Sequence, residues 1–148
     1  MEIRLNKSID RWLDLSNGKK ELEIKIDHLT REQYYKLEQI ILSCNDLPYV
    51  VDKEKGTAGF DFARMSAEQK AKALTYNRKY MEYYLKYTIK AWRGVKENGV
   101  EVPLSLINNE MEDSYWTGFL AKLTYEEIEK IFQMIESEVN FGITDLKK

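Results

Sequence analysis

An Asn98-Gly99 turn signal limits the possible folds of this chain more than any other feature. Both central residues of a type I′ β-turn need positive φ, and Asn-Gly is among the pairs that tolerate it best. Short valine-containing segments, which favour strands, flank the turn, and Pro103 ends the second of them. Gly94 is expected to end the helical segment that precedes the turn. The sequence therefore predicts a β-hairpin at about 93–102.

A long helical pattern directly precedes this hairpin. Ser66 and Gln69 have the spacing of a capping box, in which each side chain accepts a hydrogen bond from the other residue's backbone N–H. Helical periodicity continues from there to a tryptophan. A helix over residues 66–92 is therefore predicted, about 40 Å long at a rise of about 1.5 Å per residue.

Trp92, at the end of that predicted helix, is expected to be a core residue. A compact aromatic cluster that includes Trp116 and Phe119 lies downstream, so Trp92 is predicted to fix the long helix to this cluster. Five residues of this region form a structural signature without catalytic character: Trp92, Gly94, Asn98, Gly99 and Pro103.

A row of tyrosines marks a second face of the long helix, nearly opposite its apolar stripe. These residues are Tyr76, Tyr80, Tyr83 and Tyr87. Because the apolar stripe already offers enough surface for a core, the tyrosines are predicted to be the partner-binding or self-association face. The alternative is that the helix runs through the centre of the domain and buries both faces.

Two shorter helices and a small sheet complete the predicted architecture. Capping boxes begin helices over residues 30–45 and 125–140, and an apolar–polar alternation within residues 1–27 predicts antiparallel strands joined by a hairpin. Residues 48–64, which contain two glycines and alternating charges, are predicted to be a loop. The predicted fold class is therefore α+β, a mainly helical single domain over residues 1–148 with a small N-terminal antiparallel β-sheet.

Three further predictions concern the second half of the chain. A short helix or turn is predicted around residues 105–112. Asn140 and Gly142 are expected to end the final helix, and residues 146–148 are expected to be frayed.

Composition and charge argue against several classes of function. The formal net charge is −2 with both signs interleaved, which disfavours nucleic-acid binding. No apolar run approaches the ~20 residues of a membrane span, so no membrane association is predicted. Cys44 is the single cysteine and lies on the apolar side of a helical pattern. A buried free thiol in a reducing cytoplasm is therefore predicted.

The residues that commonly perform catalysis form no recognisable pattern. His28 is the single histidine, so it cannot build a His-rich metal site, and no nucleophile motif accompanies it. The glycines at 56 and 59 lack the Lys-Ser/Thr of a phosphate loop. The sequence predicts a protein that is not an enzyme, with no catalytic residues, no cofactor and no metal.

The order of these elements resembles the tail assembly chaperones of long-tailed bacteriophages and related prophage proteins. Residues 29–32, Leu-Thr-Arg-Glu, are similar to the start of the first helix in that family. Residues 89–108, IKAWRGVKENGVEVPLSLIN, resemble the family's Trp-x-Gly-Val run with its later glycine, proline and asparagine. Residues 48–64 and the row of tyrosines have no counterpart in the family pattern.

The resemblance implies a chaperone that acts in the host cytoplasm during tail morphogenesis. Such proteins bind the tape measure protein, help to recruit tail tube protein and self-associate as homo-oligomers. The two terminal lysines are compatible with a frameshifted longer form. The alternative function is a phage virion structural subunit, a tail or head–tail connector component that forms stable rings or tubes. A gene position just before a very long coiled-coil gene would favour the chaperone.

Overall fold

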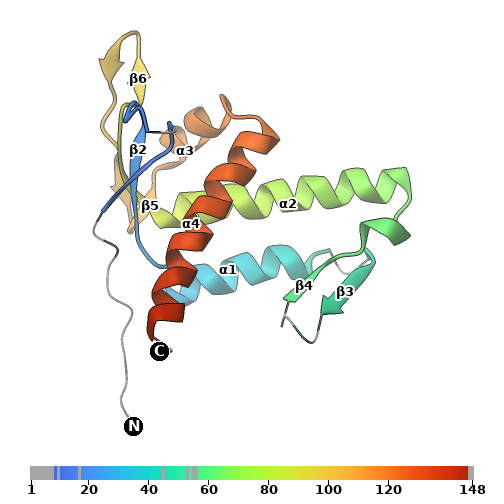
Figure 1. The fold of residues 1–148 in the computed structure, drawn as a ribbon. Helices are drawn as coiled ribbons and strands as arrows, with labels where there is room; N and C mark the ends of the chain where they lie inside the picture. The colour runs from blue at the N-terminus through green and yellow to red at the C-terminus, as the bar shows by residue number, and fades with distance from the viewer. Residues whose placement is uncertain are drawn as a thin grey trace.

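The computed structural model describes residues 9, 11–16, 18–44, 46–52, 54 and 57–146. Its architecture is α+β, as predicted, with helices packed against small antiparallel sheets (Figure 1). The helices are α1 (Arg31–Leu42), the 3-10 helix η1 (Phe62–Arg64), α2 (Ala67–Thr88), α3 (Asp113–Leu120) and α4 (Tyr125–Leu146). The strands are β1 (Trp12–Asp14), β2 (Glu23–Ile26), β3 (Tyr49–Asp52), β4 (Thr57–Phe60), β5 (Ile89–Arg93), β6 (Lys96–Glu97), β7 (Val100–Glu101), β8 (Leu106–Ile107) and β9 (Glu110–Met111).

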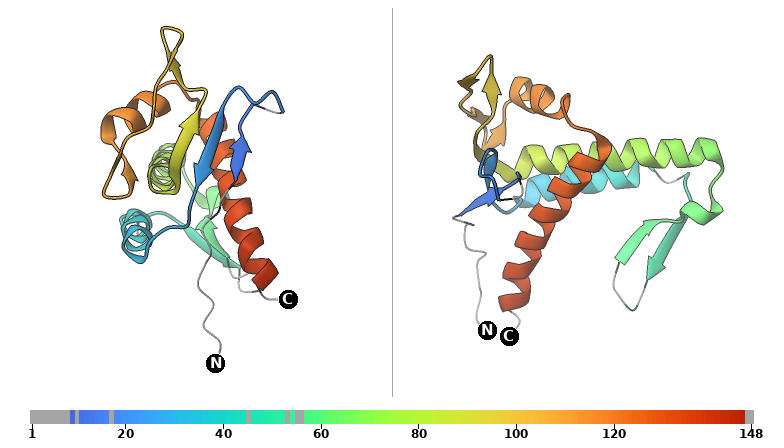
Figure 2. Two further views of the ribbon diagram at one scale, coloured as in Figure 1. Left: turned by 90° about the vertical axis from the view of Figure 1, so that its left-hand side faces the viewer. Right: turned by 45° about the horizontal axis from the view of Figure 1, so that its top comes forward.

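Helices α1 and α2 lie side by side and antiparallel, and α4 crosses them (Figure 1). The three-stranded sheet lies at the C-terminal end of α2, and the β3–β4 hairpin lies at the opposite end of the helix pair (Figure 2). The three predicted capping boxes begin α1, α2 and α4. They join Thr30 to Gln33, Ser66 to Gln69 and Thr124 to Glu127, with N–H to oxygen distances of 3.0–3.2 Å.

Helix α2 ends at Thr88, four residues earlier than predicted. Residues Ile89–Arg93 form β5, which pairs antiparallel with β2. The Thr88 carbonyl accepts a hydrogen bond from the Asp27 N–H at 2.9 Å, so the end of β2 already binds the helix terminus. The predicted helix over 66–92 is therefore wrong in its last turn, because pairing with β2 overrides a local pattern that continues unbroken.

The three-stranded sheet has the order β1-β2-β5 and a buried face. Leu13, Ile24 and Trp92 lie in register across the three strands, and all three are buried. On the paired ends of β2 and β5, the Arg93 guanidinium binds the Glu23 carboxylate with two contacts of 3.0 and 3.1 Å. Strands are thus confirmed within the N-terminal region, while residues 1–8, 10 and 17 of the predicted strands and hairpin lie outside the described residues.

Two segments form hairpins where a loop and a short helix or turn are expected. Within residues 48–64, β3 and β4 form an antiparallel hairpin and η1 follows, so the predicted loop is wrong. Within residues 105–112, β8 and β9 form a second hairpin, with Asn108 and Asn109 at φ of 52° and 63°. Of the short helix or turn predicted for this segment, the turn is confirmed and the helix is wrong, because two consecutive left-handed residues make a turn and not a helix.

Helix α4 continues past Asn140 and Gly142 to Leu146, so the predicted end at residue 140 is wrong. A glycine inside a helix costs only about 1 kcal/mol relative to alanine, which does not by itself end the helix. Residues 147 and 148 of the predicted frayed terminus lie outside the described residues. Among the described helices, none combines the length and apolarity needed to cross a bilayer.

The buried apolar side chains form two clusters of very different size. The larger lies beneath the three-stranded sheet and joins the C-terminal half of α2 to α3 and α4. The smaller lies at the opposite end of α2 and consists of four residues: Cys44, Leu47, Met65 and Ala73. The molecule therefore has a packed end, at the sheet, and an open end, at the β3–β4 hairpin.

Candidate protein-binding groove

The Asn98-Gly99 hairpin forms as predicted. Glu97 pairs with Val100 across a two-residue turn, in which Asn98 and Gly99 have φ of 52° and 78°. Pro103 follows β7 and is exposed. The two positive φ values explain why this turn could be identified from the sequence alone.

Gly94 occupies a position that only glycine can fill. Its φ is +89°, and a Cβ there would lie 1.8 Å from the Glu21 carbonyl oxygen. The Gly94 N–H also donates to the Glu101 carboxylate at 2.8 Å, which ties the start of the β6–β7 hairpin to its second strand. This close approach lets β5 leave the sheet and turn directly into the hairpin.

Trp92 is buried, as predicted, but it lies on β5 and not on the long helix. Its indole N–H donates to the Val102 carbonyl at 2.8 Å, and its ring centroid lies 5.4 Å from that of Phe119. Trp116 binds elsewhere: its indole donates to the Glu82 carbonyl on α2, and its ring lies 5.0 Å from Tyr83. Trp92 therefore fixes the sheet and hairpin to α3, while Trp116 fixes α3 to α2.

The four tyrosines of the predicted row on α2 do not form one continuous solvent-facing surface. Tyr87 is only 4% exposed, and Tyr83 packs between Tyr87 and Trp116. This half of the helix buries both faces, which is the alternative left open by the sequence. Tyr76 and Tyr80 are half-buried and lie toward the open end. The partner-binding role of the row stays a prediction, and only these last two tyrosines reach a hollow surface.

Tyr76 and Tyr80 line a groove of about 560 Å³, here called the aromatic groove. Its lining comes from α1, the β3–β4 hairpin, η1, α2 and α4, and the helix pair runs between α4 and that hairpin (Figure 1). Ile41 of α1, Phe60 of β4 and Phe132 of α4 contribute apolar side chains to it. The Phe132 ring contacts Tyr80 edge-on, with centroids 6.0 Å apart. Residues distant in the sequence therefore build one apolar surface.

The polar side chains of the aromatic groove are acidic or neutral. Glu129 and Glu136 of α4 line it, and no lysine or arginine is found among its described lining residues. Gln133 donates to Glu129 at 3.4 Å. Burial, followed by the nearby Tyr34, Glu136 and Glu38, raises the pKa of Tyr80 to about 12. The groove thus combines aromatic rings with negative charge.

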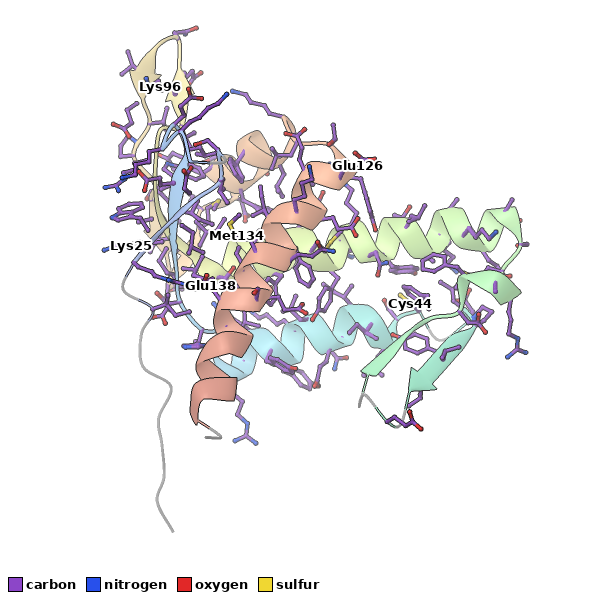
Figure 3. All side chains as sticks on the ribbon, in the orientation of Figure 1. Lys25, Cys44, Lys96, Glu126, Met134 and Glu138 are labelled. Carbon is purple, nitrogen blue, oxygen red and sulfur yellow. The ribbon has the colours of Figure 1, made fainter. Side chains whose placement is uncertain are left out.

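Cys44 lies between the end of α1 and the β3–β4 hairpin (Figure 3). It is buried, as predicted, and its thiol donates to the Ile40 carbonyl at 3.3 Å. Burial raises the pKa of the thiol, so the reactive thiolate is disfavoured. His28 lies between β2 and α1 and lines neither this groove nor the second one. In the described part of the chain, no three His, Cys, Asp or Glu side chains are grouped as metal ligands would be.

A second groove of about 600 Å³ lies between the β6–β7 hairpin and α3 and is here called the hairpin groove. Val95, Tyr115 and Phe119 line it together with charges of both signs, among them Lys122 and Glu97. The lining carries two lysines, Lys96 and Lys122, and one glutamate, Glu97, so its charges are not of a single sign. The aromatic groove, by contrast, has a defined electrostatic character.

No protein-family model, characterised protein or solved structure matches this chain. The chemistry of the aromatic groove follows from its own lining. Aromatic and aliphatic side chains bury apolar surface of a partner, and half-buried tyrosines keep their hydroxyls available to water. Sequence reasoning missed Phe60, Phe132, Glu129 and Glu136 as groove residues. The pair Phe60 and Phe62, isolated within an otherwise polar segment, was the one local signal for this surface.

Proposed function

We propose that this protein is a non-enzymatic phage tail assembly chaperone. It binds the tape measure protein and tail tube subunits in the cytoplasm of the bacterial host while the tail is built. The observation that carries the proposal is the aromatic groove, an open apolar surface lined by Tyr76, Tyr80, Phe60 and Phe132. Such a surface suits reversible binding of an apolar stripe better than it suits chemistry on a small molecule.

The physical task of such a chaperone explains the groove. A long amphipathic helix exposes its apolar stripe until assembly buries it, and exposed apolar surface promotes aggregation. Covering this stripe gains about 25 cal/mol for each Å² removed from water. The tyrosine rings supply that area while their hydroxyls stay hydrated in the free state. Binding of the stripe therefore prevents aggregation and remains reversible.

The residues that carry the family resemblance also support the proposal. Residues 89–108 fold into β5, the β6–β7 hairpin and the start of the β8–β9 hairpin. Within them, Gly94 and Trp92 have defined structural tasks, which gives a physical reason for a Trp-x-Gly pattern at this place. Self-association through exposed apolar side chains of β3, Val50 and Val51, completes the proposed behaviour.

Co-expression with the tape measure protein from the same gene region tests this function. We expect the tape measure protein to stay soluble and to co-purify with this chain. Replacing Tyr76 with Ser, on the groove, should reduce the soluble yield several-fold. Replacing Tyr35 with Ser should not, because Tyr35 is 61% exposed and lies outside the groove lining.

The proposal fails if the tape measure protein aggregates equally with and without this chain. Mass spectrometry of purified phage particles separates the chaperone from a virion subunit. A chaperone is absent from mature particles, whereas a structural subunit is present at a fixed copy number.

A further inference from the structure

We infer that the aromatic groove binds an α-helical segment whose apolar stripe is flanked by lysine or arginine. The inference takes from the proposed function only that this groove receives a protein partner. It adds the chemistry of the segment that is bound, which we derive from the backbone elements and the charges around the groove.

The backbone around the groove favours a helix over an extended peptide. Helices α1, α2 and α4 supply most of the lining, and their backbone N–H and C=O groups are already bonded within the helices. An extended peptide lying on them would leave its own backbone groups without partners over an apolar surface. A helix satisfies its backbone internally and needs to offer only side chains. The groove therefore accepts a helix at lower cost.

The charges around the groove specify a basic partner. Glu129 and Glu136 are separated by seven residues, so they lie on the same side of α4 about 10 Å apart. None of the ion pairs among the described side chains involves either carboxylate, and no described lining residue is a cation. Lysines or arginines beside the apolar stripe of a partner would meet these two carboxylates. A partner with acidic flanks would be repelled by them.

Several groups place this negative charge next to the aromatic lining. Tyr80 and Glu136 line the same groove, and burial first, followed by Tyr34, Glu136 and Glu38, raises the pKa of the Tyr80 phenol. The apolar contact and the charge contact are therefore made side by side. This is the arrangement that an amphipathic helix with basic flanks presents, with its apolar stripe between two rows of cations.

Tyr76 and Tyr35 provide a matched pair of substitutions. Tyr76 is half-buried and lines the aromatic groove, whereas Tyr35 is 61% exposed and lies outside this lining. The substitutions Tyr76→Ser and Tyr35→Ser each remove one tyrosine ring, and the first removes it from the groove.

The test uses two synthetic helical peptides of about five turns, ~18 residues, with one leucine stripe in common. One peptide carries lysine on both sides of the stripe and the other carries glutamate. Fluorescence anisotropy of the labelled peptides measures binding to the full chain. We expect the lysine peptide to bind at least about tenfold more tightly than the glutamate peptide, the ratio expected when two partly exposed charge contacts change sign.

Variants then locate the bound peptide. Glu129→Lys combined with Glu136→Lys should reverse the preference, while Glu126→Lys, on the same helix but outside the lining, should preserve it (Figure 3). Tyr76→Ser should weaken binding of the lysine peptide about tenfold or more, and Tyr35→Ser should leave it unchanged. Circular dichroism and urea unfolding establish that each variant is folded.

Four results would overturn the inference. They are equal affinity for the two peptides, no binding of either peptide, loss of binding in Tyr35→Ser but not in Tyr76→Ser, and self-association that Tyr76→Ser abolishes and that excludes the peptide. The last result, seen by sedimentation velocity, would make a second copy of the chain the occupant. If the lysine peptide binds as expected but the tape measure protein is not kept soluble, the proposed function fails and this inference stands. If the tape measure protein is kept soluble but the chain binds the lysine and glutamate peptides equally, this inference fails and the proposed function stands.

Discussion

Both halves of helix α2 carry tyrosine, but they lie in opposite environments. At the C-terminal end, Tyr84, Leu85 and Tyr87 are buried against the sheet, α3 and α4. At the N-terminal end, Leu74 is 45% exposed and Ala73 alone is buried in the first three turns. An aromatic residue on this helix is therefore a core residue or a groove residue according to its position along the axis. The side of the helix on which it lies does not decide this.

The packed end of the molecule mainly provides stability, and the open end mainly provides the proposed binding surface. The packed end contains the larger apolar cluster and the three-stranded sheet, so most of the free energy of folding comes from it. The open end has four buried apolar residues and a two-stranded hairpin, which is marginally stable by itself. An incompletely covered surface is costly for stability, but it is what a binding site requires. We therefore expect substitutions at the packed end to affect unfolding and those at the open end to affect binding.

The largest contrast is expected between two glycines. Gly94→Ala places a Cβ 1.8 Å from a backbone oxygen at φ +89°, so the chain must shift, and we expect a loss of about 4 kcal/mol or more. Gly59→Ala, at the open end, meets no atom and should change the free energy of unfolding by less than about 0.5 kcal/mol. Urea unfolding followed by tryptophan fluorescence measures both. Similar losses for the two variants would show that the ends are equally packed.

A smaller contrast is expected along the row of tyrosines. Tyr87→Ala removes a buried ring from the larger cluster and should cost about 3–4 kcal/mol, in the range of other large aromatic truncations. Tyr76→Ala removes a half-buried ring at the groove and should cost about 1 kcal/mol, while weakening peptide binding. Thermal unfolding and the anisotropy assay report the two effects separately. A Tyr76→Ala variant as unstable as Tyr87→Ala would place the whole row in the core.

The smallest expected effect depends on pH and belongs to the boundary between the two ends. Burial is the main cause that raises the pKa of Tyr80 from 10.0 to about 12. The unfolded chain releases this proton near pH 10, whereas the folded chain retains it. The associated stability is therefore present below pH 10 and is lost as the pH rises toward 12. At pH 11 we expect a loss of about 1 kcal/mol from this group.

Urea unfolding of the wild type and of Tyr80→Phe at pH 8 and pH 11 measures this loss. The wild type should lose more stability than the variant, which has no phenol to ionise at this position. Equal losses would mean that the Tyr80 hydroxyl is as hydrated as in the unfolded chain, and that the open end extends further along α2 than the burial indicates.

Features that depend on neighbouring residues could be predicted from the sequence. The capping boxes that begin α1, α2 and α4 each use side chains three residues apart. The β6–β7 turn needs two adjacent residues with positive φ, and Asn98-Gly99 supplies them. Burial of Cys44 and Trp92 follows from their apolar character. The caps and the turn depend on contacts between neighbouring residues, and the burial of the two side chains follows from the transfer of apolar groups out of water. Neighbouring residues and residue type are therefore sufficient to predict these features.

Features that depend on partners distant in the sequence could not be predicted in this way. Ile89–Arg93 continues a helical pattern but becomes β5, because β2 lies beside it and satisfies its backbone groups. Residues Tyr49–Asp52 and Thr57–Phe60 form a hairpin within a segment whose glycines and charges are typical of a loop. In both places the hydrogen bonds between strands outweigh a weak local preference.

The sequence by itself determined the fold class, the starts of three helices, the Asn98-Gly99 hairpin and the presence of an unusual row of tyrosines. The tertiary structure alone decided which tyrosines are core and which are groove, because burial depends on what packs against each turn of α2. It also assembled the aromatic groove, whose residues come from elements spread between Ile40 and Glu136. No periodic sequence pattern predicts a surface of this kind, since its residues become neighbours only after the chain has folded.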